Sequence, residues 1–373
     1  MSTLLEIRNA AGTVVAACED YTAFTGSIRY NDVGAWTVTL PLTSASAGLL
    51  LTPGYGIQFT VNDVLVLSGI ALTADGDTGD GAGQVTISGA DDMLVLADRL
   101  ASAQPATATQ PYSVSAYDAR TGAAETIIKQ YVNLNAGPGA VTARQWPGLT
   151  IAADDAQGTS VKGNARWGRL LDVAAELALA GGLGLSCVGL VFDVTVPEDL
   201  SETVEFSEQR GSLGRVAFSQ QAPGSTYAYV GGSGEGTART FYEQAATESL
   251  AAGWPRRERF RDARDTTDAV VLAQRAVEEL GADVDATKLG LTIEAIDAPG
   301  CRWPADYQVG DLVTVVTPWG VTLTRRVTGL QVALSAEAGT VITPTLGVLA
   351  PETPTALAAL SAQARRLARL ETR

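Results

Sequence analysis

Residues 25–42 (TGSIRYNDVGAWTVTLPL) carry the pattern that most restricts what this chain can fold into. Trp36, Val38 and Leu40 alternate with threonines, so a strand here would bury one face and expose the other. A helix would scatter the same side chains around its axis. The chain also has 39 glycines and 15 prolines, which favours many short strands joined by tight turns.

Two more stretches among the first hundred residues predict strands. Residues 55–75 (YGIQFTVNDVLVLSGIALTAD) contain two strand patterns around Asn62 and Asp63, a pair suited to a tight hairpin turn. Residues 83–100 (GQVTISGADDMLVLADRL) add another strand and the start of a short helix. We therefore expect residues 1–100 to form one barrel-like β-domain.

The next part of the chain mixes helical and strand patterns, which predicts an inserted α+β domain at 101–200. One predicted helix has an apolar face made of Ala124, Ile127, Ile128, Tyr131 and Val132. A second helix is expected between an N-cap at Asn164 and a stop at Gly181. Its predicted buried stripe consists of Trp167, Leu170, Leu171, Ala174 and Leu177.

A second inserted region is expected at 201–285, with strands first and a helix at its end. Asp265 is the predicted N-cap of this helix, Asp268 lies in its first turn and Gly281 follows its end. Residues 286–350 return to strand patterns and predict a second barrel-like β-domain. The fold class expected from the whole chain is α+β and β-rich.

Two segments in the first and last of these domains share a plan. Gly56–Ile70 and Gly310–Leu330 each contain a glycine turn, a strand, a tight turn and a second strand, followed by Gly with Ile or Leu. The similarity is short. Two unrelated hairpins and two copies of one barrel element are both consistent with it.

The final segment, 351–373, is predicted to be a helix. Its residues Leu357, Leu360, Ala364 and Leu367 are spaced by three, four and three positions, which is typical of a coiled-coil seam. Two heptads are too few to associate alone. The helix would therefore form a trimer seam between copies already held together, or pack on its own domain.

The composition excludes several kinds of chemistry. The chain has no histidine, which removes the Ser-His and Cys-His nucleophile systems and the usual general base near neutral pH. Its three cysteines, Cys18, Cys187 and Cys301, show no metal-ligand spacing and are expected to be buried, unreactive thiols. We predict no catalytic, metal-binding or cofactor-binding residue.

Charge and hydropathy restrict the partners and the location. The net charge of −15 argues against sequence-independent binding to nucleic acids. No apolar run approaches the roughly 20 residues that cross a bilayer, so no membrane anchor is expected. The first residues lack the basic segment and apolar core of a secretion signal, so we expect the chain to fold in a cytosol.

A glycine-rich loop at 227–240 (YAYVGGSGEGTART) raises the question of a phosphate site. A P-loop needs Gly-Lys-Ser/Thr at the start of a helix, and no lysine follows this loop. Glu235 would place a negative charge where phosphates bind, and no βαβ unit is expected around it. Because glycine permits tight reversals, we interpret the loop as a turn.

Two charged stretches offer further candidates. Asp75, Asp77 and Asp80 could give oxygens to calcium, but their spacing misses the EF-hand pattern, so a hairpin tip is the favoured interpretation. Residues 256–268 (RRERFRDARDTTD) mix both charges and suit a solvated surface, an ion-pair network or a subunit contact.

The order of several stretches resembles the tail-hub, or minor tail, proteins of long-tailed phages of actinobacteria. The resemblance covers residues 20–350 and rests on FTGSIRYNDVGAWTVTLPL, LLLTPGYGIQFTVNDVLVLSGI, GAAETIIKQYVNLNAGPGA, VEFSEQRGSLGRVAFSQQAPGSTYAYVGGSGEGTARTF and DYQVGDLVTVV. It implies a baseplate-hub-like fold with two barrel-like β-domains and α+β domains inserted between them. No catalytic residues carry over, because a hub needs none.

The resemblance also implies an assembly and a location. Such hubs are homotrimers at the tail tip, assembled in the host cytoplasm and located in the virion. Their partners would be the distal tail protein ring, the tape measure protein and the tail-tip or receptor-binding proteins, and DNA would pass through without specific binding. The trimer adapts the six-fold tube to three-fold components and closes or gates the tube.

Two other classes of function compete with this one. A carbohydrate-binding or carbohydrate-cleaving β-protein that contacts the host cell wall would need a groove lined by aromatic side chains, whereas the six tryptophans are scattered singly along the chain. An acidic enzyme with a glycine-rich cofactor loop is disfavoured by the composition of that loop and by the missing histidines.

Overall fold

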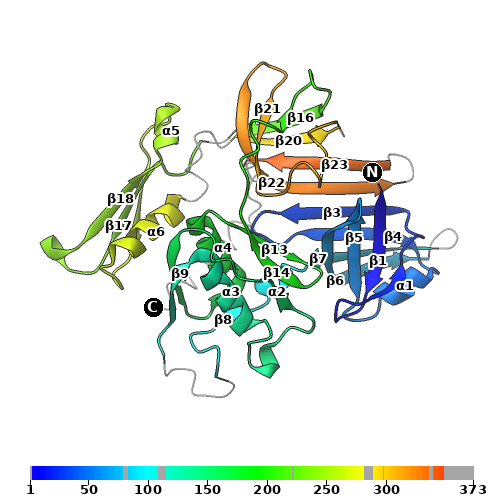
Figure 1. Ribbon diagram of the computed structural model, residues 1–373, viewed down its shortest axis with the longest axis horizontal. Helices are drawn as coiled ribbons and strands as arrows, with labels where there is room; N and C mark the ends of the chain where they lie inside the picture. The colour runs from blue at the N-terminus through cyan, green and yellow to red at the C-terminus, as the bar shows by residue number, and fades with distance from the viewer. Residues whose placement is uncertain are drawn as a thin grey trace.

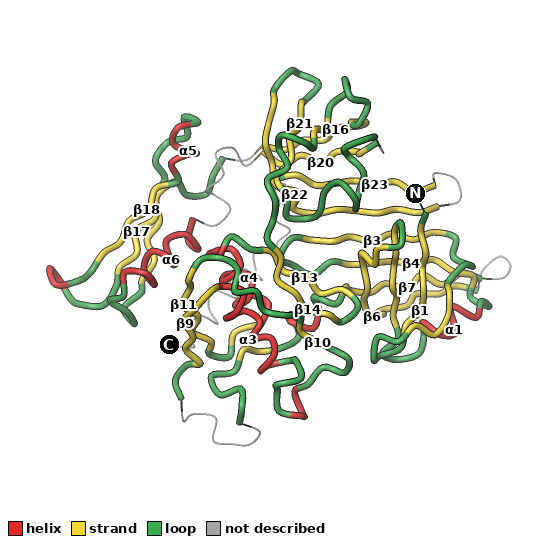
Figure 2. The backbone as a smooth tube through the Cα atoms, in the orientation of Figure 1, coloured by secondary structure: helices red, strands yellow, loops and turns green. Residues whose placement is uncertain are grey.

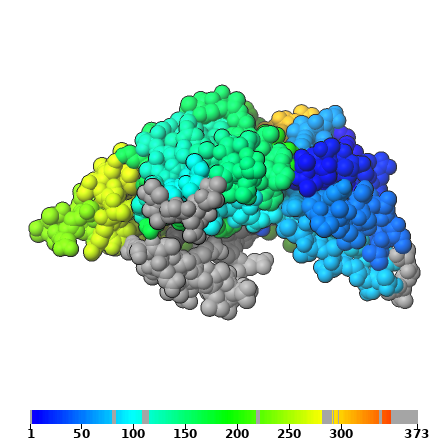
Figure 3. Space-filling view, turned by 90° about the horizontal axis from the view of Figure 1, so that it is seen from below, coloured from blue at the N-terminus to red at the C-terminus, as the bar shows by residue number. Residues whose placement is uncertain are grey.

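The computed structural model describes residues 2–78, 83–107, 115–220, 222–280, 289–296, 298–335 and 339–347. These residues form three units, each with its own apolar core. Figure 3 shows them in a row, with the blue N-terminal part at one end, the green unit in the middle and the yellow unit at the other end.

The largest unit is a 13-stranded sheet built from both ends of the described chain (Figures 1 and 2). Its strands follow the order β16-β20-β23-β22-β3-β4-β7-β6-β5-β1-β2, with β21 paired to β22 and β15 to β21. The short helix α1 (Ala45–Leu50) connects β4 to β5. The strands are β1 Thr3–Arg8, β2 Val14–Ala17, β3 Ala23–Arg29, β4 Ala35–Pro41, β5 Gly56–Val61, β6 Val64–Asp77, β7 Gln84–Asp91, β15 Glu205–Phe206, β16 Leu213–Gln220, β20 Leu289–Ala295, β21 Leu312–Val316, β22 Thr322–Ser335 and β23 Gly339–Leu346.

Pairing between β3 and β22 joins the two halves of this sheet. The two strands run antiparallel, with Ala23 opposite Ser335 at one end and Arg29 opposite Gly329 at the other. The sheet therefore continues through both segments for which the sequence predicts separate barrel-like domains. Among the described strands its path ends at β2 and β16 without closing, so the two predicted barrels are not confirmed.

Two strands of the predicted inserted region also join this sheet. β15 pairs in parallel with β21, and β16 pairs antiparallel with β20. Sequence patterns predicted strands within 201–285 but could not identify their partners, which lie about 70 to 110 positions further along the chain. The predicted domain boundary at residue 201 stays a prediction.

The core of the sheet confirms the predicted alternation of buried and exposed side chains in β4. Trp36, Val38 and Leu40 of β4 are fully buried, and Trp36 donates a hydrogen bond from Nε1 to the Ala90 carbonyl at 3.3 Å. The same apolar cluster includes Trp303 and other residues from the C-terminal half of the sheet. One core therefore serves both ends of the chain, which stabilises their association by burial of apolar surface.

The predicted hairpin turn at Asn62 and Asp63 is confirmed. Both residues have positive φ, 47° and 65°, as a two-residue turn between antiparallel strands requires. This turn connects β5 to β6, and the segment Gly310–Leu330 likewise contains an antiparallel hairpin, β21 and β22. The two similar sequence segments therefore both form hairpins of the same sheet.

The second unit packs two helices, α3 and α4, against small sheets. The predicted helix at Ala124 is confirmed as α3, and its five predicted apolar residues are buried. The elements are α2 Leu94–Ala97, β8 Leu100–Ala101, β9 Asp118–Ala123, α3 Ala124–Asn135, η1 Thr142–Arg144, β10 Thr150–Ile151, β11 Ser160–Ala165, β12 Gly168–Arg169, α4 Leu170–Gly181, β13 Gly184–Val188 and β14 Val191–Thr195.

The predicted N-cap of α4 at Asn164 is wrong. Asn164 lies in β11, and the helix begins only at Leu170 because β11 pairs with β9 through Ala165. Trp167 is therefore not part of the buried stripe: it has a φ of 58° and is 40% exposed. The helix does end at Gly181, where Gly182 takes the left-handed conformation with a φ of 74°.

The third unit is a three-stranded sheet, in the order β18-β17-β19, covered on one face by a helix. Its helix begins later than the sequence predicts. Asp268, not Asp265, accepts a hydrogen bond from the Val270 backbone N at 2.9 Å, whereas Asp265 pairs with Arg275. Gly281 lies outside the described residues. The elements are β17 Tyr227–Gly231, η2 Gly236–Ala238, β18 Phe241–Ala245, α5 Thr247–Ala251, β19 Glu258–Asp262 and α6 Ala269–Leu280.

Close backbone packing in the large sheet predicts an effect of one substitution. A Cβ at Gly89 would lie 2.1 Å from the Ile70 carbonyl oxygen and 2.4 Å from the Trp36 ring. Gly89→Ala should therefore lower the free energy of unfolding by about 3 kcal/mol or more. Gly48→Ala in α1, where a Cβ meets nothing within 4 Å, should be neutral or stabilising. Chemical denaturation of both variants tests this, and equal effects would contradict it.

Candidate functional site

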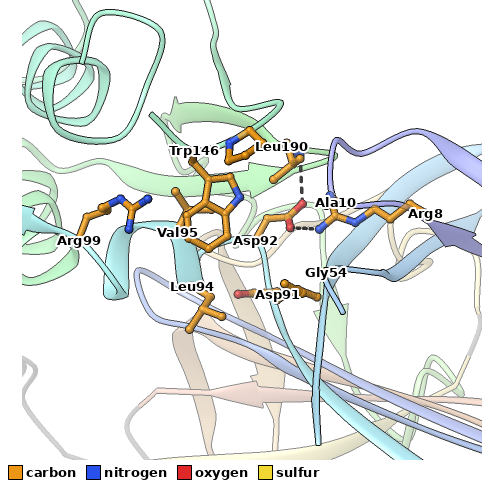
Figure 4. A pocket seen from close by; sticks show the side chains of 12 residues that line it. Arg8, Ala10, Gly54, Asp91, Asp92, Leu94, Val95, Arg99, Trp146 and Leu190 are labelled. Atoms are coloured by element: carbon orange, nitrogen blue, oxygen red, sulfur yellow. Dashed lines mark hydrogen bonds and ion pairs between the residues drawn. The ribbon is translucent and has the colours of Figure 1, made fainter. Parts of the chain in front are cut away.

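A cavity of about 250 Å³ lies where the large sheet meets the inserted α+β unit. Arg8 of β1 and Asp91 and Asp92 at the end of β7 line it from the sheet, and Trp146 and Leu190 line it from the insert (Figure 4). Residues far apart in the sequence thus meet at one place. Because ionisable groups line this cavity, it is a candidate binding site.

Asp92 makes most of the polar contacts in this cavity. Its carboxylate accepts hydrogen bonds from Arg8 Nη2, from Ser68 Oγ at 2.5 Å and from the Leu190 backbone N at 3.0 Å. The Arg8 and Asp92 side chains are only 4% and 2% exposed. A buried carboxylate with three donors is well compensated for its loss of hydration.

These contacts hold the tip of the β13–β14 hairpin. Gly189 and Leu190 form that tip with φ values of 63° and 59°. The Gly189 backbone N donates to Ser68 Oγ at 2.5 Å, in addition to the bond from Leu190 to Asp92. Side chains of the sheet therefore satisfy both backbone donors of a turn that belongs to the insert.

Asp91, beside Asp92, has a raised pKa. Burial raises the pKa of Asp91 to about 7, and the negative charge of Asp92 adds to the rise. Hydrogen bonds from the backbone N of Gly34 at 2.9 Å and of Met93 at 3.1 Å act in the opposite direction. Near neutral pH this carboxyl group therefore exists in both protonation states.

The opposite wall of the cavity is aromatic. The Arg99 guanidinium lies over the Trp146 ring, 5.2 Å from its centroid, and Figure 4 shows Trp146 between Arg99 and Asp92. Asp92 bonds Arg8 within the sheet and accepts from the Leu190 N of the hairpin tip, Ser68 accepts from the Gly189 N, and Asp91 bonds backbone amides. The arrangement thus joins two units, and Asp92 and Ser68, with Arg8 as the counter-charge of Asp92, act as a buried polar joint between them.

The glycine-rich loop is a turn, as the sequence predicts. It connects the antiparallel strands β17 and β18. The Gly232 backbone N already donates to Thr240 O at 2.8 Å, and the Ser233 N to Thr266 O at 2.8 Å. Arg239 donates to the Gly232 carbonyl at 3.0 Å. Amides engaged in this way do not form a cradle for phosphate.

The candidate calcium ligands and the predicted seam lie partly or wholly outside the described residues. Asp75 and Asp77 lie in the last residues of β6, whereas Asp80 lies outside the described residues. In the described part of the chain, no group of three or more Cys, Asp or Glu side chains is placed to hold a metal ion. The predicted seam residues Leu357, Leu360, Ala364 and Leu367 also lie outside the described residues.

The charged stretch 256–268 forms an ion-pair network, one of the three alternatives from the sequence. Arg256 pairs with Glu258 at 2.6 Å, and Arg261 pairs with Glu278 of α6 at 2.8 Å.

No helix in the described ranges is long and apolar enough to cross a membrane.

The three cysteines are buried, as predicted. Burial raises the pKa of Cys18 to about 11 and raises the pKa values of Cys187 and Cys301 as well. Such thiols stay protonated near neutral pH and are poor nucleophiles.

The sequence did not predict the joint at Asp92. The only local signal was the pair Asp91-Asp92 directly after a predicted strand, where a buried acid needs a donor. Arg8, Ser68 and Leu190 carry no signal that would connect them to it, because each is separated from Asp92 by at least 24 positions.

Comparison with known proteins identifies the family. The model of the family described as Siphovirus ReqiPepy6 Gp37-like protein matches residues 4–348. The chain belongs to this family. No curated protein matches its sequence.

Solved structures share the fold of this family member. The prophage MuSo2 43 kDa tail protein from Shewanella oneidensis matches with a TM-score of 0.62 and 12% identity, over 93% of this chain and 98% of that one. A tail protein from Neisseria meningitidis MC58 gives 0.58 and 15%, over 93% and 97%. Prophage tail protein gp18 from Listeria monocytogenes EGD-e gives 0.58 and 12%, over 98% and 99%.

The buried joint predicts a large effect of a small change. Asp92→Asn leaves Arg8 buried without its counter-charge and should lower the free energy of unfolding by about 3 to 5 kcal/mol. Asp172→Asn removes the partner of Arg169 in a half-exposed pair at 3.6 Å and should cost less than about 1 kcal/mol. Urea unfolding of both variants measures the difference, and similar losses would refute the joint.

The raised pKa of Asp91 predicts a pH dependence of stability. Between about pH 4 and pH 7 the folded protein keeps a proton that an unfolded aspartate has released. The free energy of unfolding contributed by Asp91 should therefore fall as pH rises through this range and level off above it. Asp91→Asn should flatten this slope, and the exposed Asp75→Asn should not. Unfolding curves at several pH values test it.

Proposed function

We propose that this protein is the tail hub of a long-tailed phage, working as a homotrimer at the tip of the tail tube. The family to which it belongs is named after a siphovirus protein, and three solved structures that share its fold are described as tail proteins. The role is structural rather than enzymatic. The resemblance to hubs of actinobacterial phages points to an actinobacterial host.

The sheet is the observation that carries this proposal. Its N-terminal half contains the β5–β6 hairpin and its C-terminal half contains the β21–β22 hairpin. Three copies would present six hairpins of similar plan. Such an arrangement can contact a six-fold ring of distal tail protein on one side and three-fold components on the other. The chain would in this way adapt one symmetry to the other and close or gate the tube.

A free strand edge supports association between copies. β2 is one end of the described sheet path, and its Val14 and Val15 are 40% and 44% exposed. An edge strand with exposed valines is a site where another chain can pair. The predicted helix at 351–373 would add its apolar seam, which runs from Leu357 to Leu367, near the three-fold axis.

The remaining partners follow from the same role. The tape measure protein and the tail-tip or receptor-binding proteins would contact the trimer, and all would assemble in the host cytoplasm before becoming part of the virion. The net charge of −15 suits a channel through which DNA passes without specific binding.

Native mass spectrometry tests the trimer. The full chain and a version that ends at Ala350 should be compared over a range of concentrations. Loss of the trimer on truncation would support the seam at Leu357–Leu367, and survival of the trimer would limit assembly to the body of the protein. A strict monomer at every concentration would contradict the proposed homotrimer.

The edge strand gives a second variant. Val15→Lys should weaken the trimer by at least about tenfold in dissociation constant, because a charge on an edge strand discourages pairing. Val64→Lys, at the exposed first residue of β6, is the matched control and should leave the trimer unchanged. Equal behaviour of the two variants would exclude the β2 edge from the interface.

A further inference from the structure

The three-stranded sheet of β17, β18 and β19 has one covered and one open face. Ala228 and Val230 of the central strand point to α6 and are fully buried. The residues between them belong to the opposite face, because side chains alternate along a strand. Register places Tyr229 of this face beside Glu243 and Phe260, and Gly231 beside Phe241.

The open face carries four aromatic rings in two groups. Phe241 and Phe260 are 58% and 55% exposed, and their ring centroids are 6.4 Å apart. The rings of Tyr227 and Tyr229 have centroids 5.1 Å apart. Exposed aromatic clusters of this kind mark interaction sites. Figure 1 shows β17 and β18 at the far left, in an arm well away from the large sheet.

An arginine orders each group of rings. The Arg239 guanidinium lies 5.6 Å from the Phe241 centroid and 5.3 Å from that of Phe260. Arg256 lies 3.6 Å from the Tyr227 centroid. Because these contacts restrain the side chains before any ligand arrives, binding would lose little conformational entropy.

Both arginines of the face are paired within it. Arg239 pairs with Asp262 and Arg256 pairs with Glu258 at 2.6 Å, while the Glu243 carboxylate accepts a hydrogen bond from Tyr227 at 2.8 Å. Neither arginine therefore needs an anionic occupant. Carboxylates are depleted from the cores of protein interfaces, yet three of them lie among these rings. This combination suits a polar, uncharged occupant.

We propose that this face, made of Tyr227, Tyr229, Phe241 and Phe260 with their polar neighbours, binds a neutral carbohydrate. The C–H faces of sugar rings stack on exposed aromatic rings, and the hydroxyl groups bond to carboxylates and guanidinium groups that keep free acceptor and donor positions. The site goes beyond the proposed hub function, because it would operate in a monomer or in a trimer.

Binding of defined oligosaccharides to the full chain tests this. The probes are neutral hexasaccharides of glucose (β1,3- and β1,4-linked), xylose, mannose and N-acetylglucosamine, with an anionic hyaluronan hexasaccharide for comparison, measured by isothermal titration calorimetry. At least one neutral probe should bind more tightly than the anionic one. No binding of any neutral probe at 10 mM, a concentration on the order of the weakest specific affinities, would overturn the proposal.

Two single variants localise the binding. Phe241→Ala and Phe260→Ala should each weaken it by about tenfold, since each removes one stacking ring. Leu72→Ala, an equally exposed position at 57% in the large sheet, should leave it unchanged. Circular dichroism should be the same for all three variants. Unchanged affinity in both phenylalanine variants would place any binding elsewhere and refute the assignment.

Discussion

The pairing of β3 with β22 is the interaction on which the rest of the structure depends. Ala23–Arg29 and Gly329–Ser335 are about three hundred residues apart, and their ladder makes one sheet out of the two ends of the described chain. Closing so long a loop costs chain entropy, which the shared apolar core has to exceed. The chain leaves this sheet and returns to it twice, between β7 and β15 and between β16 and β20, so the other two units are inserts.

Inserts that are tied only at their ends would move freely, and the polar joint at Asp92 prevents this for the α+β unit. Apolar surface alone packs without a preferred orientation, whereas the buried Asp92 carboxylate and Ser68 hydroxyl, which accept from two backbone donors of the insert, fix one geometry. The same burial that makes the joint specific raises the pKa of the neighbouring Asp91. Orientation of the insert and sensitivity to pH therefore have one physical cause.

Two of the three units suit different parts of the proposed hub function. A continuous sheet with two similar hairpins would offer a platform for a ring of neighbours, while the small β17–β18–β19 unit extends away from it (Figure 1). Its open aromatic face is stabilised by arginines that are themselves held by carboxylates. Assembly and recognition would then be located at opposite ends of the molecule and would not compete for the same surface.

The sequence by itself determined the local structure. Alternation in β4, the Asn62-Asp63 turn and the apolar face of α3 depend on neighbours along the chain, and all three are confirmed. Only the tertiary structure decided that Asn164 is a strand residue, because β9 pairs with its segment. It also decided that two predicted barrels share one sheet and that Arg8 meets Asp92. Such partners are selected by burial and hydrogen bonding between distant segments, which leave no periodic trace in the sequence.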